Sequence, residues 1–271
     1  MPRMPLAPLA AGSAPDLGDA VAGPPAGAPT KPEALAETGR LAQRIDALQE
    51  ALYAENRRAL LVVLQGRDTA GKDGVIRKVF GSINPQGLAI TSFKVPSALE
   101  LAHDYLWRVH QAVPVRGTIG VFNRSHYEDV LAVRVHALVP EAVWRPRYEQ
   151  IVQFERLLTA NGVTILKFYL HISREEQRER LLARLNDPAK YWKFSAGDLG
   201  ERERWDGYTE AYREALARTS TAEAPWYLVP ADKKYLRDLL VAQVVLETLR
   251  RMNPSFPGPP ERLEEFRRAL G

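Results

Sequence analysis

The chain has 271 residues, of which 45% are hydrophobic and 26% are charged, and its formal net charge is +4 with a pI near 9.3. This length is enough to bury one sizeable core and to carry a small accessory module. The chain has no cysteine, which excludes disulfides and cysteine-ligated metals, and its five histidines show no metal-ligand spacing. The small basic excess is only weak evidence for a polyanionic partner.

The first thirty residues are rich in alanine, proline and glycine. A signal peptide needs a continuous apolar core, and Pro5, Pro8 and Pro15 interrupt every apolar run in this segment. We therefore predict that residues 1–30 form a disordered tail. Because no apolar run approaches the length of a membrane span, we expect no membrane association and a cytoplasmic location.

The ordered part of the chain is expected to begin near Lys31 with an amphipathic helix. Its apolar residues, Leu35, Leu41, Ile45, Leu48 and Leu52, recur at helical spacing with charged residues between them. The next segment, "ALLVVLQG", is apolar enough to be a strand that is buried on both faces.

Five apolar stretches then alternate with helical patterns along the chain. The expected strands are 59–66, 88–95, 117–125, 163–172 and 224–231, and the expected helices are 72–83, 97–112, 147–162, 173–187 and 233–252. Ser-x-x-Glu capping boxes open the helices at 97 and at 173. This alternation predicts an α/β fold, a three-layer sandwich in which helices cover both faces of a mostly parallel sheet of about five strands.

The segment 185–220 interrupts this pattern. It is too polar for a core element and too rich in tryptophan and tyrosine for a disordered linker. We therefore predict a helical lid inserted into a domain that spans residues 31–254. Residues 255–271 are expected to form a proline-broken tail with a short helix.

The most informative stretch is "LLVVLQGRDTAGKDGVIRKVF", residues 60–80. A buried strand leads through a glycine-bracketed turn into a helix, which is the arrangement of a phosphate-binding P-loop. Gly66, Gly71 and Gly74 allow the backbone to approach an anion closely, and Lys72 stands where the P-loop lysine reaches the transferring phosphoryl group. A chance match at a strand–helix junction is the alternative. Arg77 and Lys78 follow one turn later and are candidates for a basic channel that leads away from the loop.

Two carboxylates in this loop depart from the usual pattern. Asp68 lies inside the loop, and Asp73 replaces the hydroxyl residue that normally binds magnesium. A carboxylate beside a phosphate is repelled unless a divalent cation lies between them, so Asp68 is a candidate Mg²⁺ ligand. The alternatives are an Asx-turn for Asp68 and a helix-capping role for Asp73.

Three separated blocks resemble the polyphosphate kinase 2 family. They are "GRDTAGKDG" at 66–74, "FNRSHYEDV" at 122–130, and "YWKFSAGD" followed by "RWDGY" within 191–208. The resemblance runs from about residue 32 to about residue 254. It implies a P-loop kinase fold related to thymidylate kinase and a Mg²⁺-dependent transfer of phosphoryl groups between inorganic polyphosphate and a nucleotide.

The resemblance also implies roles for individual residues. Lys72 matches the loop lysine, and Arg124 matches an arginine that contacts the transferring phosphate. Asn123 occupies the Walker B-like position, where most members have aspartate, and asparagine there resembles the class III subgroup that accepts nucleoside mono- and diphosphates. The phosphate-binding loop carried over from the family consists of Gly66, Arg67, Asp68, Thr69, Ala70, Gly71, Lys72, Asp73 and Gly74.

Further positions match the family with alternatives open. Glu128 and Asp129 mark the subgroup and are candidates for seating the acceptor, or they cap the next helix. Arg180 and Arg184 lie four residues apart on the helix that leads into the lid, where P-loop kinases carry arginine fingers; a solvated helix face is the alternative. The lid residues matched to family positions are Lys190 and Lys193.

The sequence therefore predicts a polyphosphate kinase that converts AMP to ADP and ADP to ATP reversibly. Its expected cofactor is Mg²⁺, with Mn²⁺ as a candidate substitute. Its expected partners are polyphosphate, AMP, ADP and ATP, with guanine nucleotides as further candidates, and a second copy of itself in a dimer or tetramer; nucleic acid is not expected. The rival functions are an ATP-dependent nucleoside monophosphate kinase of the thymidylate kinase type and a non-catalytic anion-binding protein.

Overall fold

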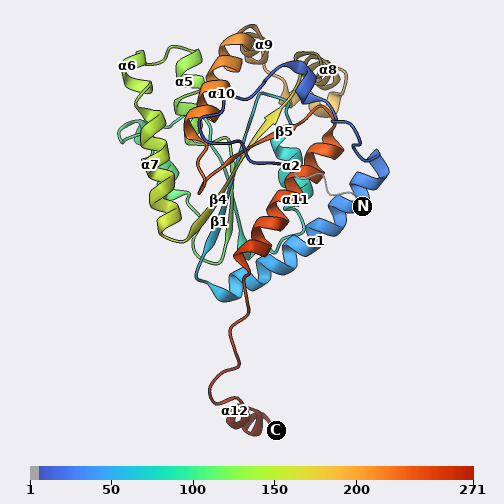
Figure 1. The fold of residues 1–271 in the computed structure, drawn as a ribbon, viewed down its shortest axis with the longest axis vertical. Coiled ribbons are helices and arrows are strands. Elements are labelled where there is room, and N and C mark those ends of the chain that lie inside the picture. Colours follow the sequence, from blue (N-terminus) through green and yellow to red (C-terminus); the bar gives the residue numbers. More distant parts are fainter. Residues whose placement is uncertain (1–5) are drawn as a thin grey trace.

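The computed structural model describes residues 6–271, and its centre is a parallel five-stranded sheet (Figure 1). The strand order is β2-β3-β1-β4-β5, and every neighbouring pair is parallel. The predicted α/β class and the number of strands are confirmed. The strands are β1 (Ala59–Gly66), β2 (Leu88–Ser92), β3 (Ile119–Asn123), β4 (Val163–His171) and β5 (Trp226–Pro230).

Helices cover both faces of this sheet. The α-helices are α1 (Lys31–Glu55), α2 (Lys72–Val79), α3 (Ala98–Leu101), α4 (Trp107–Gln111), α5 (Ala132–Val135), α6 (Glu141–Trp144), α7 (Arg147–Ala160), α8 (Arg174–Leu185), α9 (Gly197–Glu203), α10 (Trp205–Thr219), α11 (Lys234–Met252) and α12 (Leu263–Leu270). The 3₁₀ helices are η1 (Asp19–Ala22), η2 (Pro85–Gly87), η3 (His126–Asp129) and η4 (Pro188–Lys193).

The two sides of β1 belong to two separate cores. Leu60, Val62 and Leu64 pack with α1, α2 and α11, whereas Leu61 and Val63 pack with α7 and α10. Figure 1 shows α1 and α11 on one side of the strands and α7 and α10 on the other. Successive side chains of a strand point to opposite faces, so a continuously apolar strand such as β1 requires helices on both sides.

The predicted helix 97–112 is wrong as a single element. The structure has two short helices, α3 and α4, with an irregular connection between them. The Ser97 and Glu100 capping box opens α3 as expected, but Asp104 accepts a hydrogen bond from the backbone N–H of Leu106 at 2.9 Å. A short carboxylate that binds backbone two residues later forms a turn, which ends one helix and precedes the next.

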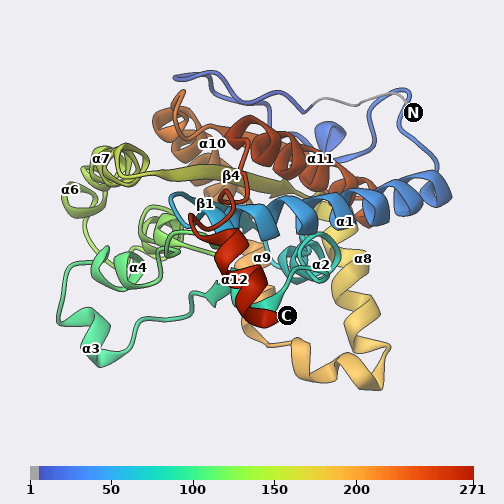
Figure 2. The same ribbon diagram turned by 90° about the horizontal axis from the view of Figure 1, so that it is seen from below.

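The predicted lid, 185–220, is too long. Only the part up to about residue 204 stands clear of the body of the domain: the segment after α8, with η4, projects in Figure 2, and α9 lies at the outer end of the domain in Figure 1. Helix α10 is part of the core, because Ala211, Tyr212, Ala215 and Leu216 are buried on one of its faces. Those residues recur at helical spacing, a signal that the surrounding charged residues and tyrosines obscured.

The expectation of a disordered N-terminal tail is also wrong for residues 6–30, and residues 1–5 lie outside the described part of the chain. The backbone N–H of Leu9 donates to the carbonyl of Trp226 at 2.8 Å, which places the segment against the outer strand β5. Leu17 and Ala22 are buried, and Asp19 accepts from the N–H of Arg174 at the start of α8. Apolar residues scattered among prolines are thus enough to hold this segment against the domain.

At the other end, residues after Met252 leave the domain in an extended path and end in the expected short helix, α12, which lies away from the body (Figure 1). Within residues 6–271, no helix combines the length and the apolar character that crossing a membrane requires.

Candidate active site

The P-loop connects the carboxyl end of β1 to the first turn of α2. Gly71 has φ +100°, and a Cβ atom there would lie 1.8 Å from Nη1 of Arg237. At Gly74 a Cβ atom would lie 2.7 Å from Nη2 of the same arginine. Arg237 comes from α11 and is almost fully buried, so its guanidinium fills the space behind the loop. Both glycines are therefore needed because Arg237 supports the loop from behind.

Cationic side chains bind the carbonyl groups of the loop. Nζ of Lys72 donates to Gly66 O at 2.6 Å, Nη1 of Arg180 donates to Thr69 O at 2.8 Å, and Nη1 of Arg237 donates to Ala70 O at 2.9 Å. The N–H groups of the first turn of α2 have no partner within the helix, as at any helix N-terminus. With its carbonyls bound from outside, the loop can present these N–H groups to an anion.

Lys72 is almost fully buried at the base of this site. Burial lowers the pKa of its ammonium group to about 8, and the nearby Arg124 acts in the same direction. An anion bound beside Lys72 would favour the protonated form and so raise this pKa. In this structure the ammonium is bound to loop carbonyls that a phosphate would replace.

This pKa gives a testable pH dependence. Only protonated Lys72 attracts a phosphate, so the affinity for inorganic tripolyphosphate is expected to fall as the pH rises through about 8. Isothermal titration calorimetry between pH 7 and pH 9.5 measures this change. Lys72→Arg is the control, because arginine stays charged over the whole range. A dependence as steep in this variant as in the parent protein would assign the effect to another group.

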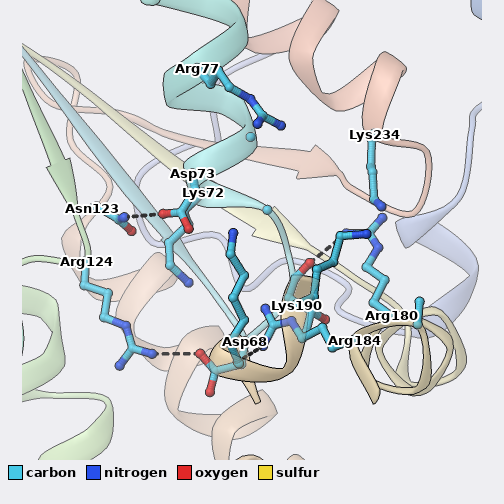
Figure 3. Close-up of a pocket in the computed structure, with 15 residues that line it drawn as sticks. Asp68, Lys72, Asp73, Arg77, Asn123, Arg124, Arg180, Arg184, Lys190 and Lys234 are labelled. Carbon is cyan, nitrogen blue, oxygen red and sulfur yellow. Dashed lines mark hydrogen bonds and ion pairs between the residues drawn. The ribbon is translucent and has the colours of Figure 1, made fainter. Parts of the chain in front are cut away.

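A cavity of about 500 Å³ opens above the loop (Figure 3). Eight of the side chains that line it are cationic and two are carboxylates, so the cavity is suited to a polyanion. The cations come from α2, the end of β3, α8, the lid and α11: Lys72, Arg77, Arg124, Arg180, Arg184, Lys190, Lys193 and Lys234.

The two loop carboxylates are each bound by a residue from the end of β3. Arg124 donates to Oδ1 of Asp68 at 2.7 Å, and Nδ2 of Asn123 donates to Oδ1 of Asp73 at 2.7 Å (Figure 3). Within residues 6–271, no backbone N–H donates to the Asp68 side chain, so the structure contains no Asx-turn there. Both carboxylates face the cavity, where they can contact a cation held between them and a phosphate.

A buried polar network holds the segment that carries Asn123 and Arg124. Nζ of Lys167 donates to Glu155 at 2.5 Å, to the hydroxyl of Tyr127 at 2.9 Å and to the carbonyl of Thr219 at 2.7 Å. Tyr127 and His126 both contact Glu155. All donors of the Lys167 ammonium are satisfied, as a buried charge requires. The network ties η3 to β4, α7 and α10 and thereby orients Arg124, whose φ is +62°.

A second cavity, of about 440 Å³, shares Asp68 and Arg124 with the first. Its walls differ from those of the basic cavity because they combine aromatic, apolar and acidic side chains. Besides the shared pair, they include Val95, Glu128, His136, Leu138, Glu201, Tyr208 and Tyr212. Two cavities of different character therefore meet at one carboxylate–guanidinium pair.

Comparisons with known proteins agree with this geometry. The family model described as Polyphosphate kinase 2 matches residues 30–257. The chain belongs to the polyphosphate kinase 2 family. It is 53% identical over 236 residues to the AMP/ADP-polyphosphate phosphotransferase of Meiothermus ruber, covering 87% of this chain and 88% of the relative. It is 52% identical over 227 residues to the ADP-polyphosphate phosphotransferase of Rhodopseudomonas palustris, covering 79% of this chain and 78% of the relative.

A solved structure shows the same fold. The polyphosphate kinase 2 from Arthrobacter aurescens TC1 superposes with a TM-score of 0.87 at 43% sequence identity, covering 89% of this chain and 87% of the other. Membership of this family makes the protein a phosphotransferase, and the similarity supports the polyphosphate reading over the thymidylate-kinase-type alternative.

Most of the residues predicted from the polyphosphate kinase 2 resemblance do lie around the basic cavity. The structure brings together Asp68, Thr69, Gly71, Lys72, Asp73, Gly74, Arg77, Asn123, Arg124, Arg180, Arg184, Lys190 and Lys193. Gly66 and Glu128 line the second cavity instead. Lys78 lines neither cavity, and Ala70 is buried with its carbonyl bound by Arg180 and Arg237.

Three predicted side chains have partners other than substrate. Asp129 faces Arg147 at 3.1 Å, and burial raises the pKa of Asp129 to about 6. Arg180, predicted to be an arginine finger, has both Nη atoms on backbone carbonyls and its Nε on Glu176. Arg67, predicted to bind phosphate, is buried with its guanidinium on Trp205.

Lys234 and Arg237 were missed by the sequence reasoning. Lys234 begins α11, just after the carboxyl end of β5, and in a parallel sheet all carboxyl ends meet at one edge. That rule was the available signal for Lys234. Arg237 contacts the loop only because α11 packs beside α2, and nothing local to its sequence indicates this.

Proposed function

We propose that this protein transfers the terminal phosphoryl group of inorganic polyphosphate to AMP and to ADP, in a reversible reaction. A chain of n phosphates then becomes one of n−1, and AMP becomes ADP or ADP becomes ATP. The names of the two relatives support AMP and ADP as acceptors. The observation that carries the proposal is the meeting of a basic cavity with an aromatic one at Asp68 and Arg124.

The two cavities suit the two substrates. Polyphosphate carries charge along its whole length and no base, so cationic walls without aromatic rings are suited to it. A nucleoside presents a flat base and a sugar, which Tyr208, Tyr212, His136 and Leu138 can contact. We therefore assign polyphosphate to the basic cavity and the nucleoside to the second one.

The residues at the junction would do the chemistry. A transferring phosphoryl group spreads negative charge over its equatorial oxygens, so catalysis consists largely of positioning and cationic stabilisation. Lys72 and the N–H groups of α2 would hold the donor end, and Arg124 lies where it can contact the group that moves. Arg184, Lys190 and Lys193 would enclose the site from the lid side.

The two loop carboxylates are suited to Mg²⁺ that binds together with the phosphates of the substrates. Within residues 6–271, no group of three or more histidine, aspartate or glutamate side chains forms a cage for a metal ion. Mg²⁺ usually keeps several waters and binds through one or two carboxylates plus substrate phosphates. Asp68 would hold the ion, with Asp73 as a second carboxylate in the same cavity. The bound ion would neutralise phosphate charge. Mn²⁺ prefers the same oxygen ligands.

The direct test uses ADP and polyphosphate with no other phosphoryl donor. Formation of ATP, detected by luciferase and by ³¹P NMR, is the expected result. An ATP-dependent nucleotide kinase would make no ATP under these conditions but would phosphorylate AMP from ATP. The same assay with GMP and GDP tests guanine nucleotides as acceptors. We also propose that the protein is cytoplasmic and a homo-oligomer, and light scattering tests the oligomeric state.

A pair of variants tests the assignment of the two cavities. Lys190→Ala is expected to raise KM for polyphosphate about tenfold with little change in KM for ADP, since charge-assisted contacts contribute about 1.5–3 kcal/mol. Tyr208→Ala is expected to raise KM for ADP by a similar factor and to leave KM for polyphosphate unchanged. Steady-state kinetics with each substrate varied in turn gives both values. The opposite pattern would exchange the two assignments.

Asn123 is proposed to underlie the use of AMP as well as ADP. Its amide donates to Asp73 at 2.7 Å, whereas Asn123→Asp would place two carboxylates at that separation. Two carboxylates so close together are expected to bind a cation or a proton between them, which would change the position of the bound phosphates. The rate with AMP as sole acceptor should then fall more than the rate with ADP.

Asn123→Ala is the control for this experiment, since it removes the hydrogen bond without adding charge. A loss of AMP use in the aspartate variant alone assigns the effect to charge, and undiminished AMP use in that variant would contradict the hypothesis.

A further inference from the structure

Arg67 is the one basic loop residue whose side chain turns away from the basic cavity. It is only 7% exposed, and Nη2 donates to the carbonyl of Trp205 at 2.9 Å and to the hydroxyl of Thr209. The centre of its guanidinium lies 3.7 Å from the centroid of the Trp205 ring, a close cation–π contact. Its Nε has no hydrogen-bond partner within the described residues. The guanidinium also interacts with the buried Tyr169, whose pKa is raised by burial and lowered by Arg67. Trp205, Thr209 and Tyr169 therefore surround the group.

Trp205 stands where the lid rejoins the domain. Helix α9 of the lid ends at Glu203, and α10, which belongs to the core, begins at Trp205. Trp205 is itself 7% exposed and lines neither of the two cavities. Arg67 therefore connects the P-loop to the start of α10, the core helix to which the C-terminal end of the lid is joined.

The N-terminal end of the lid is tied to the same loop. Helix α8 leads into the lid, and from it Gln177 donates to Asp68 O at 3.3 Å and Arg180 donates to Thr69 O at 2.8 Å. Arg67 thus contacts α10 and residues 68–70 contact α8, and these are the two helices that flank the lid. A movement of the loop on binding phosphate would be transmitted to both ends of the lid.

We propose that Arg67 is a positioning residue that couples the P-loop to the lid, and that it is not a phosphate ligand. Through Trp205 it determines the position of the lid, and so the distance of Lys190 and Lys193 from a phosphate in the basic cavity. Loss of the Arg67–Trp205 contact would leave the loop intact and would free one end of the lid. The kinetic readout of this inference rests on the proposed function, but its binding readout does not.

The kinetic experiment compares variants of both partners in the full chain. Arg67→Met and Trp205→Leu are each expected to lower kcat/KM for polyphosphate about tenfold, and the double variant to lower it no further than about twofold more, because both changes break one contact. Arg67→Lys should be as impaired as Arg67→Met, because lysine keeps the charge but not the planar fork. Trp205→Phe keeps a ring under the guanidinium and should restore most of the rate.

Other results would overturn the inference. Near-normal activity of Arg67→Lys would indicate that Arg67 acts by its charge alone, as a phosphate ligand. Near-normal activity of Trp205→Leu, together with low activity of Arg67→Met, would lead to the same conclusion. A tenfold rise in KM for ADP would make it a nucleotide contact, since Arg67 also borders the second cavity. Circular dichroism and Tm identify a variant that does not fold; Thr209→Val then replaces Trp205→Leu, with a smaller expected loss of about threefold.

The binding experiment needs no turnover. Trp192 is in the lid, is 77% exposed, and lies with its ring centroid 4.9 Å from Nζ of Lys193. Inorganic tripolyphosphate that binds Lys193 should pull its ammonium away from the Trp192 ring and so change the emission of Trp192. The contribution of Trp192 is the part of the signal that Trp192→Phe removes. Arg67→Met should abolish at least half of this change while tripolyphosphate still binds.

The full change in emission in Arg67→Met would overturn the coupling. Absence of ATP formation by the parent protein, together with the expected change in emission, would overturn the proposed function and leave the coupling in place.

Discussion

Replacing Lys72 by alanine is expected to lower the rate of phosphoryl transfer from polyphosphate by about 10³-fold, the loss typical of removing one preorganised donor from a transition state. Lys72 is the buried cation at the base of the basic cavity, next to the first turn of α2. Its ammonium now rests on the carbonyl of Gly66, from which a phosphate can take it over. Without it, the N–H groups of α2 face the developing charge alone.

Lys78→Ala is the matched control for this variant. Lys78 lies on the same helix and carries the same charge, but it lines neither cavity. Its activity should stay within about twofold of that of the parent protein, as is usual for surface substitutions. The Tm of Lys72→Ala should not fall, because burial makes the charged lysine unfavourable in the folded state. A rate near that of the parent would remove Lys72 from the mechanism.

Replacing Asp68 by asparagine is the second change with a large expected effect, a loss of about 10²-fold or more in kcat. The substitution keeps the size and shape of the side chain and removes its charge. In the parent protein this charge faces Arg124 at 2.7 Å and lies where both cavities meet. Asparagine would be a weaker ligand for a divalent cation and would remove the nearer of the two carboxylates that face Arg124, leaving Glu128 at 4.0 Å, so both the metal and the guanidinium would be held less firmly.

The dependence on Mg²⁺ separates these two causes. If the carboxylate holds the metal, Asp68→Asn should need several times more Mg²⁺ for half-maximal activity. If it acts only through Arg124, the Mg²⁺ requirement should stay the same while kcat falls. Asp46→Asn, on α1, makes the same charge change far along the chain from the loop and should leave both values unchanged. Full activity of Asp68→Asn would contradict any role for the carboxylate.

Both experiments concern residues that were recognisable from the sequence, for a physical reason. The P-loop is a local structure, in which glycine spacing, a buried strand and the start of a helix determine the position of every N–H group within ten residues. Lys72 and Asp68 could therefore be assigned before any tertiary contact was known. Asn123 and Arg124 follow a buried strand, and the carboxyl ends of parallel strands meet at one edge of the sheet.

Two site predictions concern side chains that have a choice of partners. Arg67 and Arg180 have the composition of phosphate ligands, and both were predicted to contact substrate. In the structure their guanidinium groups instead bind Trp205 and the loop carbonyls. An arginine offers five donors in a planar fork, and whether these meet a phosphate or a carbonyl depends on which helix lies beside it. That information is absent from the residues around it.

The length of the lid and the course of the N-terminal segment were misjudged for a related reason. Helix α10 and residues 6–30 both look polar or proline-rich along the chain, and both are held by a few apolar side chains such as Leu216 and Leu17. Burial of these few side chains outweighs the average composition of a segment only once a complementary surface exists. No local pattern reveals that surface.

The sequence by itself determined the α/β class, the phosphate loop and the family, because repeated strand–helix patterns and glycine positions act over short distances. Only the tertiary structure decided that β1 lies between β3 and β4, that Asn123 and Arg124 each bind one loop carboxylate, and that Arg237 supports the loop from behind. These contacts join residues far apart in the chain. They follow from how two layers of helices pack on a sheet, which depends on all of the buried side chains together.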